Sequence, residues 1–231
     1  MYFDPLYFAL ALPGLVLALL ATWMTRSTFA KYSHVSAASG LTGAQAAARL
    51  LQSQGVSGIT IREHEGFLSD HYDPRDLTLN LSPDVYGSNS LSAIGVACHE
   101  AGHALQHAKL YGPLKLRTEL VPLTNIGSQL SYILFFAGML MNFPLLLKVG
   151  VGLFLLTVIF AFVTLPVEWD ASRRAKLLMV SAGIVSPLEQ ASAAKVLNAA
   201  FLTYVASAVT ALLTLLYYLI RSGLLGGRSR D

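Results

Sequence analysis

Residues Cys98 to His107 read CHEAGHALQH, and this segment decides how the rest of the chain is interpreted. It contains the pattern H-E-x-x-H at His99, Glu100 and His103. At about 100° per residue, the two histidines lie on one face of a helix, roughly one turn apart. Two imidazoles on one face can bind one ion, and a catalytic zinc takes three protein ligands and keeps one position open. The pattern therefore predicts one Zn²⁺ on His99 and His103, with Glu100 as general base toward the water that the metal activates.

The residues around the pattern argue against a chance match. H-E-x-x-H specifies only three positions, and a surface helix can carry two histidines for solubility alone. Buried charge, however, is costly unless it is paired or bound to a metal. Gly102 also fits a buried helix, because a glycine there usually marks close approach of another element. The other surrounding residues are small or apolar, as in a buried helix: Leu91, Ala93, Ile94, Val96, Ala97, Ala101, Ala104 and Leu105.

Two neighbouring residues are weaker candidates for the metal. Cys98 directly precedes His99 and points about 100° away from the histidine face, so we expect a buried small side chain there. His107 extends the histidine face by another turn. About two helical turns, or about 11 Å, separate His99 from His107, which is too far for them to share one tetrahedral ion. We therefore expect that His107 is not a metal ligand and that it either contacts a ligand from behind or lies on the surface.

The composition indicates a membrane protein. Of the 231 residues, 54% are hydrophobic and 13% are charged, and the mean hydropathy of +0.56 exceeds that of ordinary soluble domains. The net charge of +3 does not indicate nucleic-acid binding, because no basic cluster is interleaved with aromatic residues. The single cysteine cannot form an internal disulfide. Cysteine content therefore does not indicate whether the protein is in an oxidising or a reducing compartment.

Four apolar segments, at about 6–24, 122–144, 145–165 and 199–220, are long enough to cross a hydrocarbon core of about 30 Å. The first lacks a preceding basic residue and a clear cleavage site, so we expect a retained anchor. The segments predict a mainly α, polytopic membrane protein with a small zincin-like α+β domain. We divide the chain into transmembrane helix 1 (1–25), a zincin-like catalytic region (26–120), a transmembrane hairpin (121–166), loops and helices that supply a further ligand (167–198), transmembrane helix 4 (199–221) and a disordered tail (222–231).

The catalytic region contains signals for a helix and two strands. Thr42 can cap an alanine-rich helix that Gly55 ends. Residues 59–62 and 77–82 alternate like strands, and we expect them to pair as a small antiparallel sheet. A polar segment at 66–74 separates them. His71 or Tyr72 of this segment could donate a hydrogen bond to an oxyanion, but a solvated turn explains the same residues and is the preferred interpretation.

The third zinc ligand is predicted from the membrane hairpin. A hairpin crosses twice and returns the chain to the side that it left, and the next acidic residue is Glu168. We therefore expect Glu168 to join His99 and His103. Asp170 is a candidate to orient a zinc-bound imidazole, and an interfacial ion pair with Arg173 or Arg174 is the alternative for both acidic residues. The other candidate ligands are Glu119, Asp170 and Glu189, with Glu119 first because a glutamate on a following helix can fill this role.

The basic residues favour a cytoplasmic active site. Four crossings put both termini on one side and the predicted zinc region on the other. Of the 16 Lys and Arg residues, only Lys148 and the three C-terminal arginines fall opposite the zinc region. The positive-inside rule then predicts a multi-pass plasma-membrane protein with the zinc in the cytoplasm, although the C-terminal arginines oppose this.

Several separate motifs resemble the YugP-type membrane zinc metallopeptidases of bacteria. The resemblance covers nearly the whole chain and rests on five segments: MYFDP (1–5), LSDHYDPR (68–75), LSPDVY (81–86), HEAGHALQH (99–107) and LPVEWDASRRA (165–175). It implies a neutral zinc peptidase in the bacterial plasma membrane and supplies no substrate.

A more distant similarity links the chain to HtpX and the CAAX prenyl proteases. In those proteins the H-E-x-x-H helix is joined by a glutamate in an E-x-x-x-D segment after a membrane hairpin. The similarity implies Glu168 as the third ligand. This chain has Ser172 where the aspartate would stand, so that role is either vacant or passes to Asp170.

Together these features predict a gluzincin-like zinc metalloendopeptidase. It would hydrolyse peptide bonds of membrane or membrane-adjacent proteins, with the lipid bilayer as its other partner and no role for nucleic acid. The alternative is a zinc-stabilised membrane scaffold or chaperone-like protein that binds membrane partners without cutting them. Intact His99, Glu100 and His103 argue against an inactive relative.

Overall fold

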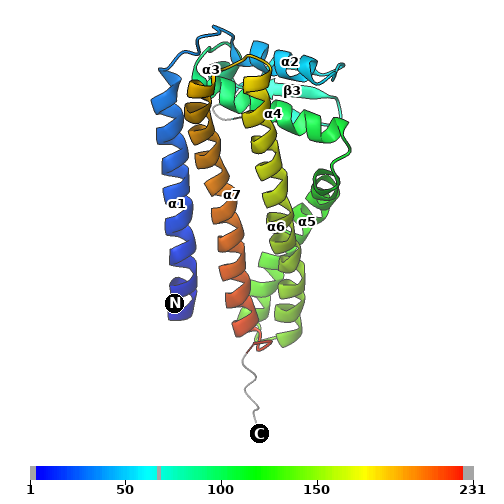
Figure 1. The fold of residues 1–231 in the computed structure, drawn as a ribbon. Helices are drawn as coiled ribbons and strands as arrows, with labels where there is room; N and C mark the ends of the chain where they lie inside the picture. Colours follow the sequence, from blue (N-terminus) through cyan, green and yellow to red (C-terminus); the bar gives the residue numbers. More distant parts are fainter. Residues whose placement is uncertain (1–3, 67–68, 226–231) are drawn as a thin grey trace. The chain divides into compact units, whose positions relative to one another are not determined.

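The computed structural model describes residues 4–66 and 69–225, which form a mainly α fold with one small sheet. The predicted fold class is thereby confirmed. The first three residues of the N-terminal motif, residues 67–68 of the polar segment and residues 226–231 of the predicted tail lie outside the described parts. The elements are α1 (Pro5–Ser33), α2 (Gly43–Ser53), β1 (Thr60–Glu63), β2 (His71–Asp73), β3 (Thr78–Leu81), α3 (Pro83–Tyr86), α4 (Leu91–Ala108), α5 (Gly112–Leu140), α6 (Pro144–Ser181) and α7 (Pro187–Arg221) (Figure 1).

The chain divides into two compact units, which we describe separately. The α4 unit comprises residues 21–115 and 166–202, and the apolar unit comprises residues 1–20, 116–165 and 203–231. Helices α1, α6 and α7 each contribute residues to both units. All residues of the predicted metal site belong to the α4 unit.

Helix α4 is the central element of the α4 unit. Ser90 begins it, since its side chain accepts a hydrogen bond from the backbone N–H of Ala93 at 3.2 Å. Fourteen of its residues are buried, so the prediction of a buried helix holds. Its core neighbours come from α2, β3 and the α4-unit parts of α1, α6 and α7: Leu50, Leu79, Phe29, Met179 and Val196.

Helix α2 confirms the local signals that the sequence carries. Thr42 caps it, and Gln45 closes a capping box by accepting from the backbone N–H of Thr42. Gly55 follows the helix with a φ of 68°, a left-handed conformation that glycine adopts at low cost. The buried face of α2 is formed by Ala46, Ala47, Leu50 and Leu51.

The sheet differs from the predicted antiparallel pair. It has three strands in the order β1-β3-β2. β1 pairs with β3 in parallel, and β2 pairs with β3 in antiparallel orientation. The expected solvated turn at 66–74 was wrong for His71–Asp73, because that segment forms β2 and occupies one side of β3. β1 is left with the other side, where it runs parallel.

The apolar unit consists of helical segments that pack closely with each other. The rings of Phe135 and Tyr218 stack with centroids 3.7 Å apart. Asp4 of the N-terminal motif accepts hydrogen bonds from the backbone N–H of Leu6 at 3.1 Å and from the Tyr217 hydroxyl at 3.0 Å. Its carboxylate also lies 3.2 Å from Nε of Arg221. Asp4 thus joins the start of α1 to the end of α7.

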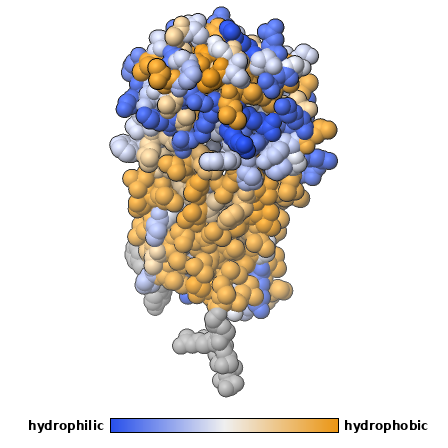
Figure 2. Space-filling model, in the orientation of Figure 1, coloured by the Kyte–Doolittle hydropathy of each residue, from blue (hydrophilic) through white to orange (hydrophobic). Residues whose placement is uncertain are grey.

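Four of the described helices are long and apolar enough to cross a membrane: α1, α5, α6 and α7. Figure 2 shows hydrophobic residues over the surface of the apolar unit, whereas hydrophilic residues gather on the α4 unit.

All four of these helices are longer than the apolar segments that predicted them. α1 runs to Ser33, and α5 begins at Gly112. α6 continues to Ser181 through the predicted segment of loops and helices (167–198), and α7 begins within that segment at Pro187. Within α6, Pro166 does not end the helix. The chain leaves it only near Gly183, which has a φ of 63°, because no earlier residue supplies a comparable helix end.

Helix α6 lies directly against α4 at Gly102. A Cβ atom built there would lie 2.7 Å from the backbone oxygen of Ala171. A backbone oxygen cannot move without shifting its helix, so this contact requires glycine. Gly95, on the same helix, has Ala193 O at 3.5 Å from an added Cβ, which is an ordinary contact.

The two glycines make a matched test of this contact. Gly102→Ala should destabilise the protein by about 1–3 kcal/mol, because overpacking forces the two helices apart. Gly95→Ala should be neutral or stabilising by up to about 1 kcal/mol, because alanine favours the helix. Thermal unfolding of the detergent-purified variants measures both, and equal melting temperatures would contradict the proposed close contact.

Candidate metal centre

Helix α4 presents His99 and His103 on one face, one turn apart. Their ring centroids lie 4.8 Å apart with the planes at 85°. The side chain of His99 is 13% exposed and that of His103 is 9% exposed. Two adjacent imidazoles are therefore held in a site that is largely closed to water.

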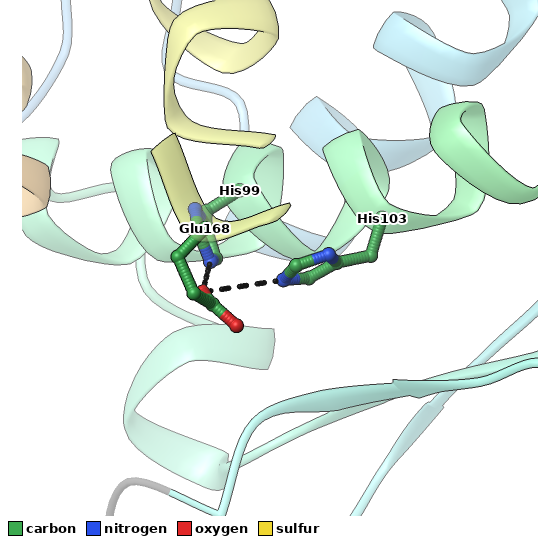
Figure 3. Close-up of side chains that lie close together, drawn as sticks. All are labelled: His99, His103 and Glu168. Carbon is green, nitrogen blue, oxygen red and sulfur yellow. Dashed lines mark hydrogen bonds and ion pairs between the residues drawn. The ribbon is translucent and has the colours of Figure 1, made fainter. Parts of the chain in front are cut away.

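Glu168 of α6 lies against both imidazoles. Its Oε2 atom is 3.1 Å from Nε2 of His99 and 3.5 Å from Nε2 of His103. Figure 3 shows the carboxylate facing the two rings. The ligand atoms of the three residues all lie within 4.8 Å of one another. Residues that are 69 and 65 positions apart in the chain thus meet at one point.

These atoms fit a single zinc ion. The ligand atoms of a tetrahedral zinc lie about 3.3 Å apart, because its bonds to nitrogen and oxygen are about 2.0–2.2 Å long. The separations of 3.1 and 3.5 Å bracket this value. Two histidines and one carboxylate are also a donor set that catalytic zinc uses. The described residues therefore hold a possible site for the zinc of a peptidase.

The charges of the site depend on one another. Burial would lower the pKa of His103, but the hydrogen bond and the negative charge of Glu168 outweigh burial and raise the pKa. The Glu168 residue is only 1% exposed, and a buried carboxylate needs such partners. A metal ion would take over this pairing and displace a proton, so metal binding weakens as the pH falls.

The other ring nitrogens of both histidines have partners. Nδ1 of His99 lies 3.0 Å from the Ser172 hydroxyl, and Nδ1 of His103 lies 3.0 Å from Oε1 of Gln106. Contacts at Nδ1 orient a metal-binding imidazole and leave Nε2 to the metal. Ser172 therefore occupies the place that the sequence analysis left vacant or assigned to Asp170.

Glu100 is held beside the sheet. Its Oε2 accepts a hydrogen bond from the backbone N–H of Tyr72 in β2 at 3.1 Å, and the residue is 9% exposed. Burial raises the pKa of Glu100, and the neighbouring His99 and His103 oppose the rise only in part. A raised pKa suits a carboxylate that takes up and returns a proton near neutral pH.

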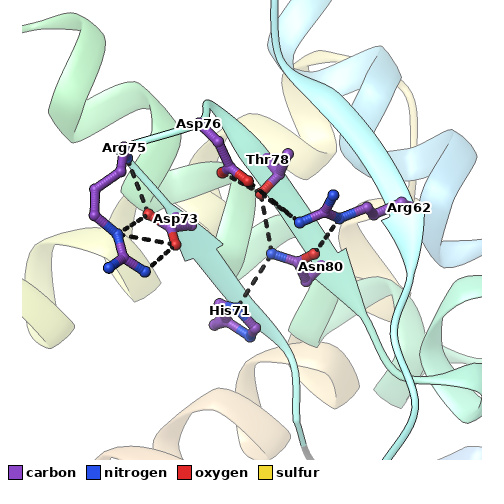
Figure 4. A network of polar contacts seen from close by, with 7 residues as sticks. All are labelled: Arg62, His71, Asp73, Arg75, Asp76, Thr78 and Asn80. Carbon is purple, nitrogen blue, oxygen red and sulfur yellow. Dashed lines mark hydrogen bonds and ion pairs between the residues drawn. The ribbon is translucent and has the colours of Figure 1, made fainter.

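Polar side chains on the sheet hold β2 in place (Figure 4). Nε of Arg62 donates to Oδ1 of Asn80 at 2.7 Å, which leaves the Asn80 amide nitrogen to donate to Nε2 of His71 at 3.1 Å. Nδ1 of His71 then donates to the backbone oxygen of Ser69 at 2.7 Å. Both ring nitrogens of His71 therefore have partners in the sheet and its preceding loop.

The remaining predicted residues lie as follows. Nδ1 of His107 is 2.8 Å from the Tyr72 hydroxyl, so His107 contacts the strand that holds Glu100. Asp170 accepts from Nε2 of Gln106 at 2.9 Å and pairs with Nε of Arg174 at 2.5 Å. Asp170 thus forms the ion pair with Arg174 that was the alternative interpretation, whereas the Nδ1 atoms that it was expected to contact face Ser172 and Gln106.

Among the described residues, the group that could hold a metal consists of His99, His103 and Glu168 and includes none of the alternative ligands. Glu189 accepts backbone N–H groups of Ala38 and Ser186 and so joins a loop to the start of α7. Glu119 lies on α5 in the apolar unit. Cys98 is buried, and burial raises the pKa of its thiol to about 12, which disfavours the thiolate that a metal would need.

Sequence reasoning missed three contributions to the site. Gln106 lies three residues after His103, a spacing that places it on the same helix face, so this signal was available. The Ser172 contact could have been inferred from its position four residues after Glu168. The backbone N–H of Tyr72 carries no signal in the sequence, because it depends on how β2 packs against α4.

Comparison with known proteins assigns the chain to a family. The model of a family described as putative neutral zinc metallopeptidase matches residues 7–223. A curated protein of Bacillus subtilis (strain 168), described as putative membrane protease YugP, is 43% identical over 215 residues, which are 93% of this chain and 96% of that protein. No solved structure matches the chain significantly. The matched region contains every residue of the candidate metal centre, and the chain belongs to the family described as putative neutral zinc metallopeptidases.

Proposed function

We propose that this protein is an integral-membrane zinc metalloprotease that hydrolyses peptide bonds of membrane or membrane-adjacent proteins. One observation carries the proposal: Glu168 meets the Nε2 atoms of His99 and His103 within 3.5 Å, with Glu100 on the same helix. A purely structural ion pair would not need a further buried carboxylate beside it. The membership of a zinc metallopeptidase family supports the same reaction class.

The chain's own residues have distinct roles in this proposal. His99, His103 and Glu168 hold the ion, which supplies a Lewis acid and lowers the pKa of bound water. Glu100 accepts the proton of the attacking water and delivers it to the leaving amine. The backbone N–H of Tyr72 holds the Glu100 carboxylate in place for both transfers. The largely buried ligands keep bulk water away from the site.

Replacement of Glu100 tests the reaction. Glu100→Gln should keep zinc, because Glu100 is not a ligand, and its amide oxygen can still accept from Tyr72. Hydrolysis of a fluorogenic peptide library by the zinc-loaded variant should fall by about 10²–10⁴-fold, the usual contribution of a general base. Unchanged hydrolysis would contradict the mechanism. Full rescue of a deletion phenotype by this variant would instead favour the scaffold.

Replacement of Glu168 tests the ligand set. Glu168→Ala should lose zinc by elemental analysis of detergent-purified protein. The loss should exceed the about 10–100-fold effect that is typical of residues behind the ligands. Glu119→Ala is the matched control and should retain stoichiometric metal. The opposite result, with zinc lost only from Glu119→Ala, would transfer the third ligand to α5.

We also propose a multi-pass arrangement in the plasma membrane with the metal centre on the cytoplasmic side. Four candidate spans and a membrane-protease relative support membrane insertion. The excess of Lys and Arg in the regions that flank the spans on the proposed zinc side supports the orientation.

The buried thiol of Cys98 allows a clean test of this orientation. It is fully shielded, so an introduced cysteine will be the reactive one. In intact bacterial cells, a membrane-impermeant maleimide should label Lys148→Cys and spare Lys109→Cys, and both should react after the cells are lysed. Labelling of Lys109→Cys in intact cells would reverse the orientation.

A further inference from the structure

Gln106 is buried at 0% exposure next to the candidate metal centre. Its amide group makes three contacts. The nitrogen Nε2 donates to the backbone oxygen of Val167 at 2.8 Å and to Oδ2 of Asp170 at 2.9 Å. The oxygen Oε1 lies 3.0 Å from Nδ1 of His103. Buried amides need partners for both ends, and this one has them on α4 and α6.

These contacts decide which way the amide points. A backbone carbonyl and a carboxylate oxygen can only accept hydrogen bonds, so the atom that faces Val167 and Asp170 is the NH₂ group. Oε1 must then face His103, and an amide oxygen can only accept. Nδ1 of His103 is therefore the donor and keeps its proton. The other nitrogen, Nε2, is left to face Glu168 and a metal.

Asp170, which fixes the orientation of the Gln106 amide, is itself held in place by Arg174. Asp170 pairs with Arg174 one turn later on α6 at 2.5 Å, and the Arg174 guanidinium lies 5.7 Å from the Tyr111 ring centroid. Asp170 thus accepts from both Arg174 and Gln106. His99 has no equivalent partner that fixes the position of its ring proton, because the Ser172 hydroxyl at its Nδ1 can either donate or accept a hydrogen bond.

We propose that Gln106 is a positioning residue, held by Val167 and Asp170, that keeps the proton of His103 on Nδ1 and so presents Nε2 to the metal. This inference rests on the proposed zinc site and adds a residue to it. It also gives Asp170 a definite role, since Asp170 acts on His103 through Gln106. The two histidines are then unequal: the amide oxygen of Gln106 fixes the tautomer of His103, whereas the Ser172 hydroxyl is compatible with either tautomer of His99.

The test compares two glutamine side chains, buried Gln106 and partly buried Gln190, that each donate to a backbone oxygen of α6. Gln106→Leu removes all three contacts of the amide with little change in volume. Gln190→Leu is the matched control, because Nε2 of Gln190 donates to the backbone oxygen of Lys176 on α6 at 2.7 Å and contacts neither histidine. The zinc dissociation constant of each full-length protein is measured in detergent by competition with a chelator, and the visible spectrum of the Co²⁺-loaded protein reports the ligand geometry.

Gln106→Leu should bind zinc about 10–100-fold more weakly than wild type, as is typical when a partner of a ligating histidine is lost. Its Co²⁺ spectrum should shift, whereas Gln190→Leu should match wild type in both measurements. Wild-type affinity and spectrum in Gln106→Leu would overturn the inference. Absence of zinc binding by the wild type would overturn the proposed function instead, so the two failures are distinguishable.

A second pair of variants tests the same role if Gln106→Leu does not fold. Asp170→Asn retains an oxygen that accepts from Gln106 and Arg174, so it should keep most of the zinc affinity. Asp170→Ala lacks this acceptor and should lose affinity to nearly the extent expected for Gln106→Leu. Equal losses in both variants would show that Asp170 acts by its charge, and would overturn the positioning role of Gln106.

Discussion

The buried carboxylate of Glu168 is the constraint on which the α4 unit depends. A carboxylate that is 1% exposed is expensive to bury unless charged or hydrogen-bonding partners surround it. Its partners are the imidazoles of α4, so α6 must lie directly against α4. Gly102 permits this approach, because any larger side chain would meet the backbone of Ala171. The contact between α4 and α6 therefore both packs the two helices together and brings the candidate metal ligands to one point.

The same contact is reinforced by polar groups from both helices. Ser172 of α6 reaches His99, and Gln106 of α4 reaches the backbone of Val167 and the carboxylate of Asp170. On the opposite flank, the N–H of Tyr72 reaches Glu100. Each of these bonds joins two different elements of the α4 unit, so the site forms only when that unit is folded.

Local sequence signals correctly predicted the features that depend only on residues close together in the chain. Thr42 caps its helix as expected, and the H-E-x-x-H spacing placed His99 and His103 on one face. Predictions that depend on distant contacts were less accurate. The sheet has a third strand and a parallel pair, because β2 takes one side of β3. α1 and α6 continue past their predicted ends, and α5 and α7 begin before their predicted starts. Hydropathy marks where a helix leaves an apolar environment and does not mark where the helix itself starts or ends.

The sequence by itself determined the membrane character, the mainly α fold and the residue types of a zinc peptidase, because composition and helical periodicity are local properties. It also indicated Glu168, through the logic of a hairpin that returns to its starting side and through family resemblance. Only the tertiary structure decided that Ser172 and Gln106 stand behind the two histidines and that a backbone N–H holds Glu100. The contacts of Ser172 with His99 and of Tyr72 with Glu100 join separate elements, and the Gln106 amide is oriented by Val167 and Asp170 of another helix. The spacing of Gln106 and Ser172 permits these contacts, but the packing of the elements decides whether they form.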